Sequence, residues 1–244
     1  MPDADLHFYF DPVCPFAWLT SSWVRQVAAA RGYVVDWRFI SLRMVNAHVD
    51  YDRQFPPDYE AGHTAGLRLL RVAARVRETL GRDAVGTYYA ALGKRNFDTP
   101  PPSPLPDTGP LDYRGAPSWL APVLTEAGLP EPLVEALEDD TLDPVIRAET
   151  DEALSLTGKD VGTPIIHFDP PAGIAFFGPV ISRLPDEAAS LELWDHVVAL
   201  ARFPGFAELK RSLRERPRLA ALGVAEDEDD VVEDWHGGSR RRQR

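Results

Sequence analysis

The first forty residues restrict the fold more than any other part of this 244-residue chain. Residues 6–11 are apolar and aromatic, which predicts a short central strand. The apolar spacing over residues 18–30 predicts a helix, and Gly32 is the kind of residue that ends one. Residues 33–42 again favour a strand. A strand, a helix and a second strand in this order predict a parallel β-α-β unit with a right-handed crossover.

The only cysteine of the chain, Cys14, lies at the junction between the first strand and the helix, and Pro15 follows it. A helix start lowers the pKa of a thiol, because unpaired N–H groups and the positive end of the helix dipole face the sulfur. Proline suits the first helical turn. We therefore expect Cys14 to be a reactive nucleophile. The alternative is a buried, inert cysteine, a common state of free thiols.

The segment Cys14-Pro15-Phe16-Ala17 resembles a C-x-x-C redox motif without its second thiol. Phe16 sits inside this turn and is a candidate apolar wall for a ligand. A second motif, VGTP, precedes an apolar strand and contains Thr163 and Pro164. An X–Pro bond is the one place where a cis peptide costs little, and a trans proline at a strand start is the alternative.

The remaining pattern is mostly helical, followed by two short strands and a charged end. Residues 58–93 favour helix, and the proline-rich residues 98–117 predict a surface loop. We expect further helices at 118–128, 131–139, 144–158, 188–201 and 206–213, and paired strands at 165–168 and 174–177. Residues 216–244 predict a flexible charged tail.

The charge balance excludes some partners. Twenty-six basic and 38 acidic residues give a net charge of −12, which argues against nucleic acid or an anionic membrane as the partner. No signal sequence and no apolar run of about 20 residues is visible, so we expect a cytoplasmic protein. The histidines are scattered without metal-ligand spacing, so we expect no metal site.

Three segments together resemble a known family: FDPVCPFAW, VGTPIIHF and AFFGPVISRLP. They are similar to the DsbA-like branch of the thioredoxin fold, and within it to the actinobacterial mycothiol-dependent nitroreductase and disulfide-isomerase-like group, over roughly residues 6–213. The resemblance implies a thioredoxin-like α/β domain (residues 1–45 and 159–215) with an inserted helical domain (residues 46–158). It also implies that Cys14 is catalytic and that Pro164 is cis and lies beside it.

The chain departs from that family where the second cysteine would be, at Ala17, and Phe16 replaces the tryptophan between the cysteines. The expected activity is therefore thiol-disulfide oxidoreduction by Cys14 alone, with a low-molecular-weight thiol (mycothiol or glutathione) as co-substrate and no tightly bound cofactor. By the resemblance, Thr163 offers backbone hydrogen bonds to that thiol, beside Pro15, Phe16 and Pro164. Asn46 either binds the cofactor or thiol, or is a helix cap or turn residue.

Two other functions stay open at this point. One is a thiol S-transferase or isomerase related to kappa-class glutathione transferases, which activate the sulfur of a bound thiol. The other is a non-catalytic member of the family that binds a thiol or a peptide. The expected partners are small thiols and mixed disulfides, disulfide-bearing proteins, and a second copy of the chain in a homodimer.

Overall fold

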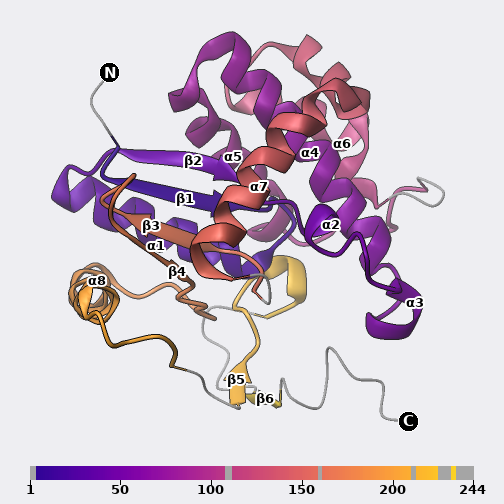
Figure 1. Cartoon of the computed structure of the whole chain (residues 1–244). Coiled ribbons are helices and arrows are strands. Elements are labelled where there is room, and N and C mark those ends of the chain that lie inside the picture. Colours follow the sequence, from indigo (N-terminus) through magenta and orange to yellow (C-terminus); the bar gives the residue numbers. More distant parts are fainter. Residues whose placement is uncertain (1–3, 108–111, 159–160, 210–212, 225–231, 235–244) are drawn as a thin grey trace.

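The structure is a computed structural model, and it describes residues 4–107, 112–158, 161–209, 213–224 and 232–234. Its centre is a four-stranded sheet in the order β2-β1-β3-β4 (Figure 1). The strands are β1 (Leu6–Phe10), β2 (Val35–Phe39), β3 (Ile165–Phe168) and β4 (Ile174–Phe177). β1 is parallel to β2 and antiparallel to β3, and β3 is antiparallel to β4. The predicted parallel pair and the two later strands are confirmed.

Helix α1 (Pro15–Arg31) connects β1 to β2. It ends at Gly32, whose φ of 72° lies in the left-handed region that suits a residue without a side chain. The predicted last helix is confirmed as α8 (Glu187–Arg202), which packs against α1. Trp23 of α1 meets Trp194 of α8 with 5.3 Å between ring centroids, and its indole N–H donates to the Ser190 carbonyl.

The side chains of β1 alternate between the two faces of the sheet. Phe8 and Phe10 belong to the main hydrophobic core, together with residues of α1 and α8. Tyr9 points to the other face, where it packs in a smaller cluster with Ala153 and Ile165. Ala153 lies on α7 (Asp143–Thr157), which crosses that face of the sheet (Figure 1). Both faces of the sheet are therefore covered by helices.

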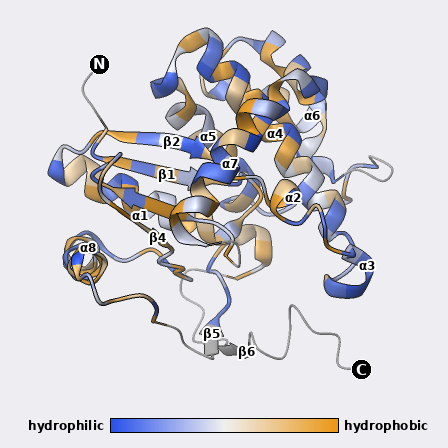
Figure 2. Cartoon of the chain, in the orientation of Figure 1, coloured by the Kyte–Doolittle hydropathy of each residue, from blue (hydrophilic) through white to orange (hydrophobic). Residues whose placement is uncertain are grey.

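Residues 46–158 leave the sheet after β2 and return to it through α7. They form α3 (Tyr51–Gln54), α4 (Tyr59–Leu80), α5 (Arg82–Phe97), α6 (Pro117–Glu126) and the 3-10 helices η1 (Tyr113–Gly115), η2 (Glu131–Glu138) and η3 (Asp140–Leu142), after the short α2 (Leu42–Val45). Figure 2 shows hydrophobic residues on α4 and α6. Tyr89 of α5 stacks on Phe10 of β1 at 3.8 Å, so these helices and the sheet share one core.

The chain after α8 differs from the prediction in two ways. Residues 206–209 form no helix, because a turn at Pro204 and Gly205 ends α8. The strand β5 (Leu213–Glu215) instead pairs with β6 (Val232–Asp234), a partner that the local pattern does not reveal. Within the stretch expected as a charged tail, Leu219 joins the main core and the 3-10 helix η4 (Ala220–Leu222) packs beside α5.

The rest of the predicted tail, residues 225–231 and 235–244, lies outside the described residues. Over the ranges that the structure does describe, none of the helices combines the length and apolar character needed to cross a bilayer.

Candidate active site

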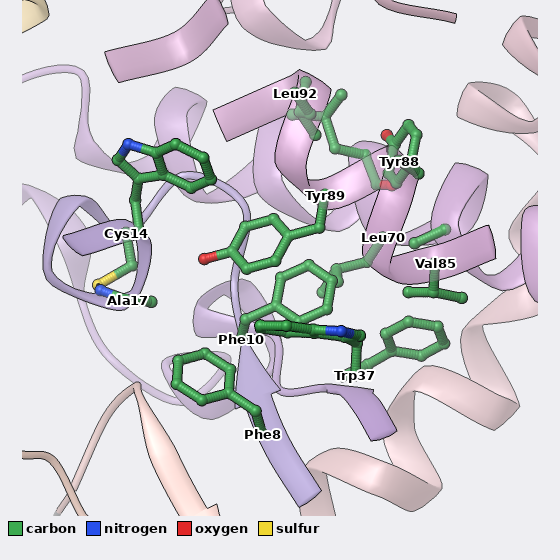
Figure 3. Packing of buried hydrophobic residues seen from close by; sticks show 14 of the residues in the cluster. Phe8, Phe10, Cys14, Ala17, Trp37, Leu70, Val85, Tyr88, Tyr89 and Leu92 are labelled. Atoms are coloured by element: carbon green, nitrogen blue, oxygen red, sulfur yellow. Dashed lines mark hydrogen bonds between the residues drawn. The ribbon is translucent and has the colours of Figure 1, made fainter. Parts of the chain in front are cut away.

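Cys14 lies at the N-cap of α1, at the end of the short loop that follows β1. Its backbone is extended, and its Sγ accepts a hydrogen bond from the Ala17 N–H at 3.4 Å, as the side chain of a capping residue does. Pro15 occupies the first helical position, where no N–H is needed. Figure 3 shows Cys14 and Ala17 next to each other, beside the aromatic packing of Phe10 and Tyr89.

The second predicted motif, Thr163-Pro164, lies next to Cys14 in the structure although it is remote from it in the sequence. The Thr163–Pro164 peptide bond is cis, and the Cys14 Sγ donates to the Thr163 carbonyl oxygen at 3.5 Å. The Thr163 hydroxyl donates to the Tyr9 carbonyl at 3.1 Å, and the Gly178 N–H donates to the Pro164 carbonyl at 2.8 Å. These bonds fasten the loop before β3 to both neighbouring strand ends. The structure therefore brings Cys14, Thr163 and Pro164 together although 149 positions separate Cys14 from Thr163.

Phe16 and Asn46 contribute less directly. Phe16 is half-buried and packs against the edge of the main core. Asn46 ends α2, and its side-chain amide donates to the Leu42 carbonyl at 2.8 Å. Of its two expected roles, the structure shows Asn46 as a helix cap, while thiol binding by its side chain stays a prediction.

The expected lowering of the Cys14 pKa is wrong. Cys14 is 8% exposed, and burial raises the pKa of its thiol to about 12. The backbone N–H groups of Ala17 and Phe16 act in the opposite direction, but they do not offset the removal of the thiolate from water. The resting sulfur is a thiol that donates one hydrogen bond to a carbonyl and accepts another from an amide.

Asp11 is a neighbour of Cys14 that the sequence analysis missed. It is completely buried, and its carboxylate accepts hydrogen bonds from the Val13 N–H at 3.0 Å and the Leu42 N–H at 2.7 Å. Burial raises the pKa of Asp11 to about 6. A polar residue ending an otherwise apolar strand, three positions before the cysteine, was the available signal.

The helical insertion also holds the Cys14 loop. The Asn96 amide of α5 donates to the Pro12 carbonyl at 3.2 Å and accepts from the Trp119 indole of α6 at 2.8 Å. Two glycines allow this close approach. A Cβ on Gly66 of α4 would come within 2.5 Å of the Asp11 carboxylate, and a Cβ on Gly93 of α5 within 2.0 Å of the Trp18 ring. No sequence signal distinguishes these glycines from others on the helices.

The assembled groups suit sulfur chemistry: one thiol, a carbonyl acceptor, an amide donor and a buried carboxyl. Within the described ranges, no three His, Cys, Asp or Glu side chains gather where they could hold a metal ion.

Comparisons with known proteins place this chain in a family. Residues 13–211 match the Rv2466c-like family, described as mycothiol-dependent nitroreductase Rv2466c. The chain is 32% identical over 206 residues to the uncharacterized protein Rv2286c of Mycobacterium tuberculosis, covering 84% of this chain and 80% of that protein. This chain belongs to the Rv2466c-like family.

A solved structure agrees with the sheet and helices described above. A putative protein disulfide isomerase from Nitrosomonas europaea is similar with a TM-score of 0.50 at 12% identity, covering 80% of this chain and 99% of that one. At this identity the likeness concerns the fold alone. The fold is a thioredoxin-like α/β fold with a helical insertion, as the resemblance implied.

Proposed function

We propose that this protein is a thiol-disulfide oxidoreductase that uses Cys14 alone and takes its second thiol from solution, with mycothiol or another low-molecular-weight thiol as the co-substrate. The contact that carries this proposal is the one between the Cys14 sulfur and the Thr163 carbonyl beside the cis Pro164 peptide. Membership of a family described as mycothiol-dependent supports the choice of thiol. A cytoplasmic location fits such a small-thiol partner.

The proposed exchange balances without any other reagent. The Cys14 sulfur attacks one sulfur of a disulfide R–S–S–R, forming the Cys14–S–S–R bond and breaking the R–S–S–R bond. The proton that Cys14 loses ends on the released thiol R–SH. A second small thiol R′–SH then attacks the outer sulfur of the mixed disulfide. The disulfide R–S–S–R′ forms, the Cys14–S–S–R bond breaks, and Cys14 leaves as a thiol with the proton of R′–SH. Ala17 supplies no thiol, so the internal closure of a C-x-x-C motif does not compete with this step.

In the proposed exchange, each neighbouring residue has a part that its position supports. The Ala17 N–H points at the sulfur that becomes negative as the proton leaves, and so favours the attacking thiolate. The Thr163 carbonyl accepts the Cys14 S–H in the resting site, and the Thr163 backbone would hydrogen-bond to the bound thiol. Phe16, half-buried next to the sulfur in sequence, would form an apolar wall of the ligand site. Asn46, at the end of α2, stays a candidate contact for the polar part of the thiol.

The test is the intact mass of the purified protein after exposure to mycothiol disulfide or glutathione disulfide, with Cys14→Ser as the matched control. We expect a prompt increase by one thiol in the wild type alone, reversed by excess reduced thiol. The disulfide that reacts faster identifies the preferred co-substrate. Folded wild-type protein that acquires no adduct would overturn the proposal.

One observation favours a second candidate, a thiol S-transferase or isomerase. The resting Cys14 is a buried hydrogen-bond donor, and such a donor can stabilise the thiolate of a bound small thiol, as a serine hydroxyl can. Cys14→Ser separates the two functions, because serine keeps the donor and loses the nucleophile. Transferase activity that persists in Cys14→Ser would select the second candidate, and complete loss would select the first. Binding of reduced thiol without either activity would indicate the non-catalytic function.

A further inference from the structure

A pocket opens where α1, β2 and α5 meet, and it is separate from the Cys14 site. Its volume is about 590 Å³, and it is lined by one face of α5 together with Arg25 of α1, Trp37 of β2 and the end of α6. At about 1.5 Å per helical residue, Arg25 lies roughly 16 Å along α1 from Cys14. Cys14, Thr163 and Pro164 do not contribute to its walls, so this pocket and the exchange site can be tested independently.

Arg25 brings into this pocket a positive charge that no carboxylate of the described residues pairs with. Its guanidinium lies over the Trp37 ring, 3.9 Å from the ring centroid, and its Nη2 donates to the Gly86 carbonyl at 3.0 Å. Its Nε is buried without a hydrogen bond. Burial lowers the pKa of Arg25 to about 10, so the group stays charged at pH 7. Arg71 and Arg77, by contrast, pair directly with carboxylates.

The indole of Trp37 supplies a second donor at the wall of the pocket. Trp37 is 6% exposed, and its ring packs in the core next to Phe8 (Figure 3). A Cβ on Gly86 would come within 2.8 Å of the Trp37 Nε1, so this nitrogen faces the side of α5 that lines the pocket. Within the part of the chain that the structure describes, the Trp37 N–H has no acceptor, although a buried N–H normally has one. Acceptors do face the indole N–H groups of Trp18, Trp23 and Trp119.

The carboxylates that border the pocket lie in water and not on its inner wall. Asp83 is 85% exposed, and Glu126 is 54% exposed and pairs with the Lys94 ammonium at 3.1 Å. Water and salt screen such exposed charges, whereas buried groups are screened much less. The buried polar side chains of the wall, Arg25 and Trp37, both present donors, so an acceptor that carries negative charge suits this pocket.

We propose that this pocket binds a small molecule through an oxyanion, a carboxylate or a phosphate group, held by the Arg25 guanidinium and the Trp37 indole N–H. A planar guanidinium matches the oxygens of either group and forms charge-assisted hydrogen bonds with them. Such a ligand would supply the missing counter-charge of Arg25 and the missing acceptor of Trp37. The side chains of Ala90 and Ala91 would offer an apolar surface to the rest of the molecule.

The experiment follows the Trp37 indole N–H signal by ¹⁵N NMR while inorganic phosphate or acetate is added at pH 7, with sodium chloride holding the ionic strength constant. We expect a saturable shift of this signal, and the probe with the lower dissociation constant identifies the preferred group. Arg25→Gln should raise that constant roughly tenfold or more, the effect of losing one charge-assisted hydrogen bond. Arg31→Gln is the matched control, because Arg31 lies on the same helix, is 37% exposed and pairs with Asp195 at the surface.

A second variant tests the indole without changing any charge. Gly86→Ala places a methyl group against the Trp37 nitrogen and should also weaken binding of the preferred probe. Equal binding by the wild type and Arg25→Gln would overturn the proposal. If Arg25→Gln does not fold, the wild type alone decides: a Trp37 signal that shows no saturable shift with either phosphate or acetate would overturn it as well. Neither result depends on whether Cys14 forms a mixed disulfide.

Discussion

Two buried carboxylates, Asp11 and Glu149, lie at neighbouring strand ends but in opposite electrostatic settings. Glu149 of α7 accepts hydrogen bonds from the Phe39 N–H at 2.9 Å and from the guanidinium groups of Arg77 at 2.6 Å and Arg38 at 3.2 Å. Among the residues that the structure describes, Asp11 accepts from two main-chain N–H groups only. Both carboxylates join a strand to a helix, yet within this described part only Glu149 has direct counter-charges.

This difference separates a structural carboxylate from one placed beside reactive chemistry. Where arginines surround a buried carboxylate, removing one partner leaves the others uncompensated, so the group contributes to stability through its pairing. At Asp11, burial raises the carboxyl pKa to about 6 because two N–H hydrogen bonds do not fully offset the loss of water, and protonation there responds to physiological pH. The four predictions that follow test this contrast, from the largest expected effect to the smallest.

Glu149→Gln should cause the largest loss of stability. The substitution leaves Arg38 and Arg77 around a neutral amide, and we expect the free energy of unfolding to fall by about 3–5 kcal/mol. Urea unfolding monitored by circular dichroism measures this change. Glu126→Gln is the control, because Glu126 is 54% exposed and pairs with Lys94 at the surface, where about 0–1 kcal/mol is expected. Equal effects of the two variants would contradict the structural role of Glu149.

Gly93→Ala tests whether the stability of the region around Cys14 depends on close packing, as the stability around Glu149 depends on ion pairs. The added methyl would meet the Trp18 ring within 2.0 Å, so α1 or α5 must shift, at a cost of about 3 kcal/mol. Differential scanning calorimetry should show a lower Tm. In Gly162→Ala the new methyl makes an ordinary 3.7 Å contact with Leu42, so this control should unfold near the wild-type temperature. A wild-type Tm for Gly93→Ala would contradict the close packing of Gly93 against Trp18.

Acid should destabilise the fold through His63. Burial lowers the pKa of this imidazole to about 4, from its ordinary value of 6.5, while its Nδ1 lies 2.9 Å from the Tyr51 hydroxyl. Because the folded pKa is depressed, the stability that His63 contributes is complete above pH 6.5 and is lost as the pH falls towards 4. Between pH 6.5 and 4.5, we expect the free energy of unfolding to fall by about 2 kcal/mol less in His63→Gln than in the wild type.

Urea unfolding at several pH values measures this effect. His196→Gln is the matched control, since the His196 side chain is 73% exposed and should leave the pH dependence as it is. Protonation of Asp11 has the opposite effect on stability over part of this pH range. Its raised pKa means that its burial costs stability above pH 6, and that this cost is relieved as the pH falls towards 3.8. Identical pH profiles for His63→Gln and the wild type would refute the role of His63.

Ala17→Cys should restore the missing half of the motif with the smallest change in stability. The Ala17 N–H already lies 3.4 Å from the Cys14 sulfur, so a thiol at position 17 stands one helical turn from Cys14. We expect oxidation to close a disulfide between Cys14 and the introduced thiol, seen as the loss of two hydrogens by mass. Since Ala17 is fully buried, the larger side chain should cost about 1–2 kcal/mol. An oxidised variant that retains two free thiols would show that this turn does not support dithiol chemistry.

Local pattern in the sequence was sufficient for much of the fold. The β-α-β opening, the strands at 165–168 and 174–177 and the last amphipathic helix all follow from apolar periodicity and from glycine and proline positions. The place of Cys14 at a helix start follows from the strand, proline and helix around it. The absence of a second thiol at Ala17 was also plain from the sequence, and it restricts the chemistry to one sulfur.

The tertiary structure decided what surrounds that sulfur. Burial of Cys14 raises its pKa where the helix start alone would lower it, because desolvation depends on every segment packed around the thiol. Thr163 from the loop before β3 and Asn96 of α5 reach the Cys14 loop across 149 and 84 positions, and Asp11 connects this loop to Leu42 across 31 positions. The sequence by itself thus determined which groups can react, through local rules of strand, turn and helix. Only long-range packing determined their protonation, since burial and pairing are set by parts of the chain that are remote in sequence.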